Sequence, residues 1–248
     1  MSIQREKIRL QAYLASCGLG SRRSCEKLIL EGRVSVNGTA AKLGDSAIPG
    51  DVVRLDRLIV RPQSRMRYLV LNKPPGFVTS MSDERGRPVA ASLLGSAVEE
   101  RVYNVGRLDQ WSSGLLLFTN DGDLTALMVH PSGLIYKEYQ VDTDLPIPER
   151  FAGEFLAGLD VDGIIYKAEA VRIIGERAMR IVLIEGKNRE IRRVLEHYGL
   201  RAVMLKRVRV GPIELGDLAE GSHRELSPEE VTSLRAYSDR LHAEGKGR

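Results

Sequence analysis

The sequence predicts an α+β protein. A small amino-terminal unit of two helices and short strands is linked to a larger unit built on a mixed, mainly antiparallel sheet with flanking helices. Two observations lead to this fold class. Beyond residue 67, many short stretches of strand type follow one another with turns but few helices between them. Before residue 57, two short helical patterns precede a hairpin and further short strands. A hydrophobic content of 43% and a charged content of 28% are typical of a globular protein.

The first unit is predicted over residues 7–56 and begins with two helices. The first helix, over 8–17, should end at the glycines that follow it. The second helix, over 22–31, should begin after Ser21, whose hydroxyl is suited to cap a helix amino terminus, and should end at Gly32.

Short strands follow these helices, and Asn37-Gly38 has the sequence of a tight hairpin turn between two of them. Residues 57–66 hold one proline and three arginines and are expected to form a linker. The second unit is predicted over 67–235. Residues 236–248 are expected to hold the end of a terminal helix and a frayed tail.

The strands of the second unit are predicted from short apolar or alternating stretches, namely 68–72, 101–105, 114–119, 137–142, 169–174 and 178–185. A helix over 188–198 carries one apolar face and should end at Gly199. A capping box that starts at Ser227, with Pro228 at the first helical position, marks the terminal helix.

The net charge of +4 is unevenly distributed along the chain. Residues 1–60 hold ten Lys and Arg against six Asp and Glu, and residues 185–211 hold eight against three. Two separate basic segments indicate an extended polyanionic partner rather than a small acidic metabolite. Charge alone leaves the alternative of two solvated surfaces equally open.

Other features exclude several classes of protein. The two cysteines, Cys17 and Cys25, and the four histidines do not have the spacing of a metal site, so no metal is expected. The start of the chain lacks the apolar region of a signal peptide, and no apolar run approaches about 20 residues. We therefore expect a cytoplasmic protein without membrane association, with both thiols free.

A charged pair, Arg107 and Asp109, comes shortly before the buried strand predicted at 114–119. A carboxylate at this place either caps a turn or pairs with the nearby arginine, and most aspartates beside glycines do so. The alternative is a carboxylate that a cation keeps ionised and that acts as a nucleophile or base. The local pattern alone favours the ordinary turn.

Three further features also have both a structural and a functional interpretation. Tyr139 is either a half-buried strand tyrosine or a platform on which a planar ring stacks. Arg192 lies at the edge of the apolar stripe of its helix, where it either pairs on the surface or reaches into a cleft. The proline turn at 72–76 leads into the polar stretch 77–88, which is long enough to be a mobile loop over a ligand.

Taken together, five motifs resemble those of the RsuA/RluB-type bacterial ribosomal RNA pseudouridine synthases: NKPPG, GRLD followed by GLLLFTNDG, KEYQV, EGKNREIRRVLEHYG and LKRVRVG. The front stretch SRRSCEKLILEGRVSVNG resembles an S4 RNA-binding domain, so the resemblance covers about residues 7–235. The chain departs from the pattern at Ser112, where the family has threonine; serine keeps the hydroxyl. Trp111 is not part of the usual pattern.

The resemblance implies roles for particular residues. Asp109 matches the essential aspartate, and Tyr139 matches the tyrosine that stacks on the target base and is a candidate general base. Arg192 matches the basic residue that forms an ion pair with the aspartate, and Leu205 matches an apolar residue that packs beside the base. Further contacts with the RNA are expected from six cationic side chains, namely Arg107, Lys73, Lys187, Arg189 and, in the S4 domain, Arg22 and Arg23.

The implied reaction converts a uridine within RNA to pseudouridine, without a cofactor or a metal ion. Asp109 would attack C1′, add to the ring or remove the 2′ proton, and the sequence does not choose among these. The implied partner is ribosomal RNA, free or within a pre-ribosomal particle, with 23S rRNA (the synthase B type) favoured over 16S, and the protein is expected to be a monomer. The alternatives are a 16S rRNA enzyme and a non-catalytic S4-domain RNA-binding or ribosome assembly factor.

Overall fold

The computed structural model describes residues 7–129 and 135–245, with side chains up to residue 240. The chain divides into two compact units. One comprises the residues up to Met66 with two short later segments, Glu99–Arg101 and Asn120–Gly122, and the other comprises the remainder. Both units combine helices with sheets, so the α+β fold class is confirmed.

The first unit packs two helices against two small sheets. Helix α1 (Leu10–Ser16) starts two residues later than predicted, because β1 (Ile8–Arg9) pairs with β4 (Ser46–Ala47). Helix α2 (Arg22–Leu30) is capped by Ser21, whose hydroxyl accepts a hydrogen bond from the Ser24 amide. Buried apolar side chains join the helices to the strands, among them Leu10, Leu14, Cys25, Ile29, Val34 and Val53.

The larger sheet of this unit is antiparallel, with the order β3 (Thr39–Ala40), β2 (Val34–Val36), β5 (Val53–Leu55) and β6 (Leu58–Ile59). Strand β6 lies inside the segment that was expected to be a linker. It pairs with β5 through Arg54 and Leu55, so the linker is shorter than predicted.

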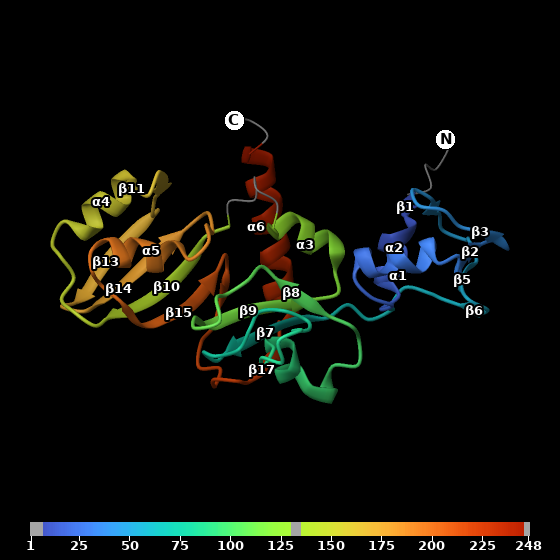
Figure 1. The fold of residues 1–248 in the computed structure, drawn as a ribbon, viewed down its shortest axis with the longest axis horizontal. Helices are drawn as coiled ribbons and strands as arrows, with labels where there is room; N and C mark the ends of the chain where they lie inside the picture. The colour runs from blue at the N-terminus through green and yellow to red at the C-terminus, as the bar shows by residue number, and fades with distance from the viewer. Residues whose placement is uncertain (1–6, 130–134, 246–248) are drawn as a thin grey trace. The chain divides into compact units, whose positions relative to one another are not determined.

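The second unit is built on one nine-stranded sheet (Figure 1). Its main order is β13 (Ala170–Gly175), β14 (Ala178–Leu183), β10 (Lys137–Thr143), β15 (Ala202–Val210), β9 (Ser113–Thr119), β7 (Tyr68–Lys73) and β17 (His223–Glu225). In addition, β8 (Tyr103–Val105) pairs with β9, and β16 (Ile213–Glu214) pairs with β15. All pairings are antiparallel except β15 with β9, so the predicted mixed, mainly antiparallel sheet is confirmed.

Several elements were not predicted. Strand β15 lies inside the sheet although Lys206, Arg207 and Arg209 interrupt its apolar pattern. The 3₁₀ segment η1 (Ala90–Ala97), the short helices α3 (Gly122–Val129) and α4 (Phe151–Ala157), and the hairpin of β11 (Leu159–Val161) with β12 (Ile164–Tyr166) were also missed. Apart from β15, these segments are short, and short segments carry little periodic signal.

Strand β9 is buried on both faces and belongs to two apolar clusters. Leu116 and Phe118 pack in the cluster that includes α4 and α5 (Glu190–His197). Leu115 and Leu117 pack in the cluster that includes α3 and the terminal helix α6 (Pro228–Gly245). Packing on both faces makes β9 a rigid support for the loop that precedes it.

Helix α6 spans Pro228–Gly245, so the end of the terminal helix, which was expected within residues 236–248, lies at Gly245. Residues 246–248 lie outside the described part of the chain. Within the described part, no helix is both long enough and apolar enough to cross a lipid bilayer.

Candidate active site

The candidate site is built around the loop Gly106–Ser112, which joins β8 to β9. Strand β8 pairs with the far end of β9, where Val105 lies opposite Leu117. Strand β15 pairs with the near end of β9, where Arg207 lies opposite Gly114. The loop therefore leaves the sheet where two strands meet the same edge of β9, and it carries Asp109 there.

Glycine is required at position 114 because β15 approaches closely. A Cβ atom at Gly114 would lie 2.2 Å from the carbonyl oxygen of Arg207 and 2.8 Å from its amide nitrogen. The φ angle of Gly114, +99°, is also unfavourable for other residues. The parallel pairing that brings β15 beside the loop thus depends on the absence of a side chain at this position.

Every backbone carbonyl of the loop from Arg107 to Trp111 accepts a hydrogen bond. Thr79 Oγ1 donates to the Leu108 carbonyl at 2.8 Å and accepts from the Leu108 amide at 3.2 Å. The Ser112 amide donates to the Asp109 carbonyl at 3.1 Å. Arg207 donates to the Arg107 carbonyl at 3.4 Å and, through Nε, to the Leu115 carbonyl of β9 at 2.8 Å.

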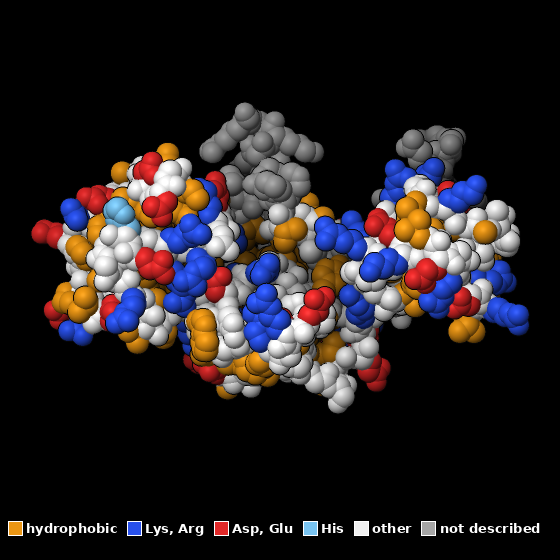
Figure 2. Space-filling view, in the orientation of Figure 1, with side chains coloured by type: hydrophobic (Ala, Val, Ile, Leu, Met, Phe, Trp, Pro, Cys, Tyr) orange, Lys and Arg blue, Asp and Glu red, His pale blue; other side chains and the backbone are white. Residues whose placement is uncertain are grey.

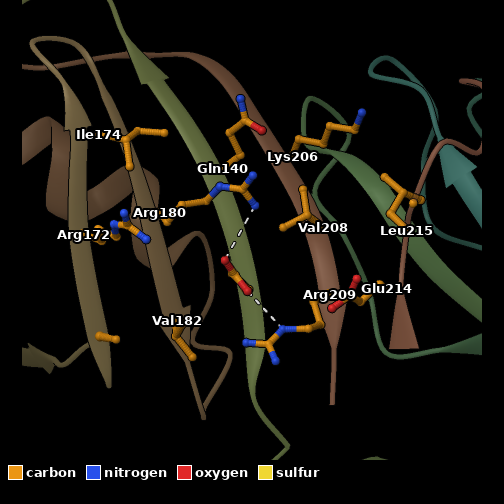
Figure 3. Close-up of a pocket in the computed structure, with 13 residues that line it drawn as sticks. Gln140, Arg172, Ile174, Arg180, Val182, Lys206, Val208, Arg209, Glu214 and Leu215 are labelled. Carbon is orange, nitrogen blue, oxygen red and sulfur yellow. Dashed lines mark hydrogen bonds and ion pairs between the residues drawn. The ribbon is translucent and has the colours of Figure 1, made fainter. Parts of the chain in front are cut away.

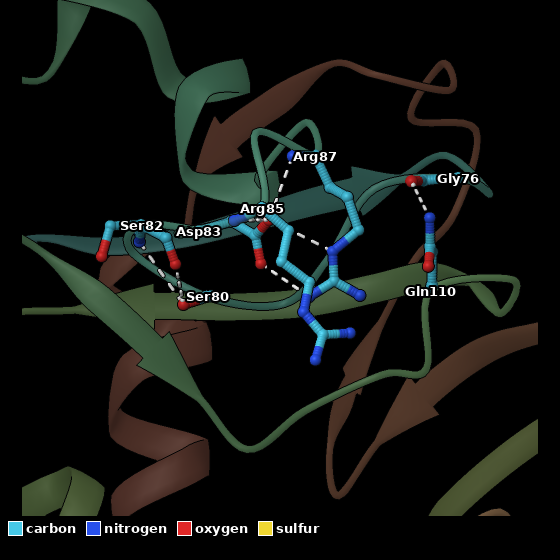
Figure 4. Close-up of polar contacts among 7 residues, drawn as sticks. All are labelled: Gly76, Ser80, Ser82, Asp83, Arg85, Arg87 and Gln110. Carbon is cyan, nitrogen blue, oxygen red and sulfur yellow. Dashed lines mark hydrogen bonds and ion pairs between the residues drawn. The ribbon is translucent and has the colours of Figure 1, made fainter.

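The NKPPG segment holds the middle of the loop. The Gly76 amide donates to the Gln110 carbonyl at 2.8 Å, and Gln110 Nε2 donates back to the Gly76 carbonyl at 3.1 Å (Figure 4). In contrast, the Asp109 carboxylate has no hydrogen-bond partner among the residues that the structure describes. Hydrogen bonds thus fix the backbone of the loop, whereas the Asp109 carboxylate is free to contact a substrate.

Asp109 lies on the wall of a cavity of about 290 Å³. Most of the residues assigned to the site in the sequence line this cavity together, namely Arg107, Asp109, Tyr139, Lys187, Arg189, Arg192 and Leu205. They come from the loop, from β10 and β15, and from α5 with the residues that precede it. Residues nearly a hundred positions apart in the chain therefore share one site.

Tyr139 and Leu205 form an apolar wall with Leu183 and Ile191. Tyr139 is 9% exposed and Leu205 is 6% exposed, on neighbouring strands of the sheet. Burial in the sheet holds the phenol ring in one orientation, which is the property that a stacking platform requires.

Cationic side chains line the opening. Figure 2 shows lysine and arginine side chains gathered on the second unit between α5 and the β8–β9 hairpin. Lys187 and Arg189 are exposed and form ion pairs with Glu185 and Glu196, both at 3.1 Å. Exposed ion pairs of this kind are weak, so both cations can exchange their partners for phosphate.

The predicted ion pair between Arg192 and Asp109 is wrong for this structure. Within the described residues, no lysine or arginine nitrogen lies within 4.0 Å of the Asp109 carboxylate. Arg192 Nη2 donates instead to the Trp111 carbonyl at 2.9 Å, because that carbonyl turns toward α5. Burial lowers the pKa of Arg192, and the nearby Arg189 lowers it further, whereas the Asp109 charge opposes this shift.

Lys73 lies beneath the loop rather than in the cavity. Its side chain is fully buried, and Nζ donates to the carbonyls of Pro74, Phe77 and Gln110 at 2.8, 2.8 and 3.2 Å. The prediction that Lys73 contacts the substrate is therefore replaced by a structural role. Burial lowers the pKa of Lys73 to about 8, and the Asp109 charge acts in the opposite direction.

The stretch 77–88 is not a loop over this cavity, since none of its described residues lines it. Asp83 organises it: the carboxylate accepts from the amides of Arg85 and Arg87 and from the Arg87 guanidinium (Figure 4). Arg87 lowers the pKa of Asp83 to about 2. This expectation of the sequence is corrected to an ordered turn.

Arg22 and Arg23 belong to the first unit, whereas the cavity lies in the second. Both are exposed in the first turn of α2. Two residues of the site were missed in the sequence, Arg207 and Thr79. Arg207 lies within the LKRVRVG motif, which is a signal that could have identified it; Thr79 has no such signal.

The comparisons with known proteins agree on one family. The pattern of the RNA pseudouridylate synthase family matches residues 67–197, and that of the S4 domain matches residues 8–53. An RNA pseudouridine synthase of Borreliella burgdorferi is 37% identical over 94% of this chain and 96% of its own. The dual-specificity RNA pseudouridine synthase RluF of Escherichia coli K12 is 34% identical over 92% of this chain and 78% of its own. A crystal structure of a pseudouridylate synthase superposes with a TM-score of 0.68 at 26% identity, covering 92% of this chain and 99% of the other.

Proposed function

Because the chain belongs to the RNA pseudouridylate synthase family, with an S4 domain at its amino-terminal end, we propose that it isomerises a specific uridine of ribosomal RNA and that Asp109 carries the chemistry. One observation supports this assignment above the others. The Asp109 carboxylate is uncommitted among the described residues, yet the backbone that carries it is fixed by hydrogen bonds on both sides. Preorganisation of this kind is what a catalytic group needs.

The other carboxylate in the cavity is a poorer candidate. Glu190, the first residue of α5, accepts a hydrogen bond from the Lys187 amide at 3.0 Å and so fixes the turn that leads into the helix. Burial raises the pKa of Glu190, which favours its neutral form. Glu190 thus supports the helix, and Asp109 is left as the reactive acid.

In the proposed reaction, the C1′–N1 glycosidic bond of the uridine breaks, the uracil turns within the site, and a C1′–C5 bond forms. The proton at C5 is lost and N1 gains one, so the overall change is an isomerisation. The uridine must leave its stack to enter, which costs a few kcal/mol. The apolar wall of Tyr139 and Leu205 offsets part of that cost by stacking on the extruded base.

Asp109 acts in this scheme by attack at C1′, by addition to the ring or by removal of the 2′ proton. Tyr139 is assigned to stack on the base and to accept the C5 proton. The cations at the opening, Arg107, Lys187 and Arg189, are assigned to the phosphates on either side of the target nucleotide.

Arg22 and Arg23 are assigned to RNA phosphates in the S4 domain, because the first turn of α2 presents free backbone amides beside them. Reversal of both charges should weaken RNA binding and reduce its dependence on salt. The same affinity and salt dependence in the variant would remove the S4 domain from the binding surface.

Among ribosomal RNAs we favour 23S over 16S as the substrate, because the stretch from NKPPG to SDERGRP resembles the large-subunit type more closely. We further propose that the enzyme acts as a monomer in the cytoplasm. Pseudouridine should be mapped in total RNA from cells with the gene, without it, and with Asp109→Asn in its place. We expect one 23S position to lose its modification both without the gene and with the variant. A modification that survives in the variant would remove Asp109 from catalysis, and a change in ribosome assembly alone would favour an assembly factor.

A further inference from the structure

The second basic segment of the chain divides between two faces of the sheet. Lys187, Arg189 and Arg192 line the active cavity, whereas Lys206 and Arg209 lie on the other face of β10 and β15. Alternation along β10 explains the division: Tyr139 and Val141 are buried in the core, and Glu138 and Gln140 point to the opposite side. The proposed active site accounts for the first group only.

We call this second surface the outer sheet face and define it by ten residues that project together from β13, β14, β10 and β15, namely Ala170, Arg172, Ile174, Arg180, Val182, Glu138, Gln140, Lys206, Val208 and Arg209 (Figure 3). It borders an open cavity of about 810 Å³. In the described part of the chain, no helix contributes a residue to the lining of this cavity.

The strand register places like charges side by side on this face. Arg172 lies directly opposite Arg180, which lies opposite Gln140, which lies opposite Lys206. One row across four strands therefore holds three cations and no anion. Like charges directly opposite one another destabilise a sheet, so this arrangement opposes folding unless an anion occupies it.

Two acids line this cavity, Glu138 and Glu214, which lies opposite Arg209, and they compensate for only part of the positive charge of the four cations. Glu138 is shared between Arg180 at 3.6 Å and Arg209 at 3.0 Å. Arg172 and Lys206 have no hydrogen-bond or ion-pair partner among the described residues, and they flank that cluster on both sides. Val208 lies between Lys206 and Arg209, and Ile174 and Val182 lie on either side of the Arg172–Arg180 pair.

We propose that the outer sheet face binds the sugar–phosphate backbone of a second segment of the RNA substrate, distinct from the segment that enters the active cavity. The inference rests on the proposed function for the identity of the polyanion. Phosphates complement the uncompensated cations, and the aliphatic side chains beside them accommodate the sugars. Because Tyr139 and Gln140 point to opposite sides of the sheet, one nucleotide cannot reach both surfaces. The RNA must therefore be long or folded enough to pass around the sheet.

The test compares a long RNA with a short one. The double variant Arg172→Glu/Lys206→Glu is measured against an in vitro transcript of the large ribosomal RNA and against a hairpin of about 20 nucleotides around the mapped uridine. We expect affinity for the transcript to fall at least tenfold. The slope of log affinity against log salt should become shallower by about 2, because about two phosphate contacts are lost. Binding and turnover of the hairpin should stay within about twofold of wild type.

Two controls keep the result interpretable. Arg240→Glu reverses one charge, half the change of the double variant, at an exposed position on α6 and should leave the transcript affinity within about twofold. Arg172→Glu alone turns a like-charge pair with Arg180 into an opposite-charge pair, so its thermal stability should equal or exceed that of wild type. A loss of affinity without a loss of stability would support a binding role.

Unchanged affinity for the transcript, or an equal loss for transcript and hairpin, would overturn the proposal and leave the face to another partner, such as an acidic protein. The proposed function can fail separately. If wild-type protein modifies neither RNA but the double variant still loses the transcript, the outer sheet face stands as an RNA surface while the catalytic assignment falls.

Discussion

Arg192 on α5 donates a hydrogen bond to the backbone carbonyl of Trp111, two residues beyond Asp109, over a distance of 2.9 Å. The arginine therefore contacts the backbone of the loop that carries the carboxylate, rather than the carboxylate itself. Its Nε is buried and has no hydrogen-bond partner in the described part of the chain. In this structure Arg192 holds the loop in place and adds positive charge beside Asp109.

Replacement of Arg192 by methionine should remove its hydrogen bond and its charge but keep its packing, because methionine resembles the aliphatic part of the arginine side chain. A hydrogen bond that involves a charged group contributes about 1.5–3 kcal/mol, so the single-turnover rate should fall by about 10- to 100-fold. Arg192→Lys keeps the charge and one donor and should recover part of the rate. A methionine variant with the wild-type rate would contradict the positioning role.

Thr79 fixes Leu108 from both sides, because its hydroxyl accepts from the Leu108 amide and donates to the Leu108 carbonyl. Thr79→Val has the same shape but removes both hydrogen bonds inside a buried region. We expect a loss of about 1–3 kcal/mol in the free energy of unfolding, measured with urea, together with a slower reaction.

Thr79→Ser is the matched control, since it keeps the hydroxyl and loses only a methyl group. If the valine and serine variants had equal rates of pseudouridine formation, the two hydrogen bonds would have no part in placing Asp109.

The strands and the helix that carry the site were predicted from the sequence better than the hydrogen bonds within the site. Strand β9, strand β10 and helix α5 were predicted from apolar periodicity, and each forms close to the expected residues. Their packing brings Asp109 and Tyr139 into one cavity. Periodicity could indicate these elements because each of them buries an apolar face.

The missing parts depend on polar groups whose partners lie far away in the sequence. Strand β15 was missed because its cations hide the strand pattern, yet Arg207 is buried there through its hydrogen bond to the Leu115 carbonyl. Likewise, Arg192 was expected to pair with the Asp109 carboxylate but donates a hydrogen bond to the Trp111 carbonyl. Backbone carbonyls occur at every position, so the sequence cannot indicate which of them a side chain will find.

Lys73 should make the reaction sensitive to alkaline pH. Its Nζ donates to three carbonyls, and its pKa is lowered to about 8. A neutral amine has only two donors, so deprotonation releases one contact beneath the Asp109 loop. The single-turnover rate should fall as the pH rises through about 8, and a rate that stays constant up to pH 9.5 would contradict this role.

The stability of the fold should respond to the same proton in the opposite direction. The pKa of Lys73 is about 8 in the folded chain and 10.5 for an unperturbed lysine, so between these values the unfolded chain binds more protons. The contribution of this group to the free energy of unfolding should therefore rise with pH over this window, by at most about 3 kcal/mol. Urea titrations of wild type and Lys73→Met at pH 8 and pH 10 isolate the contribution of Lys73. If the two proteins differed by the same free energy of unfolding at both pH values, the lowered pKa of Lys73 would be contradicted.

Gly114 provides the sharpest test of how the sheet builds the site. Gly114→Ala would place a methyl group 2.2 Å from the Arg207 carbonyl oxygen, so β9 and β15 must separate or change register. We expect a loss of more than about 4 kcal/mol in the free energy of unfolding, since a backbone atom cannot move aside as a side chain can.

Gly106→Ala is the matched control, because Gly106 also has a positive φ, +72°, but an added Cβ atom meets nothing within 4 Å. An alanine in this left-handed conformation costs about 1–2 kcal/mol. The difference between the two variants thus measures the close approach of β15 to β9 without the shared backbone strain. If both variants lost the same stability, the close approach would contribute nothing, and the parallel pairing that positions Arg207 beside the Asp109 loop would not depend on glycine.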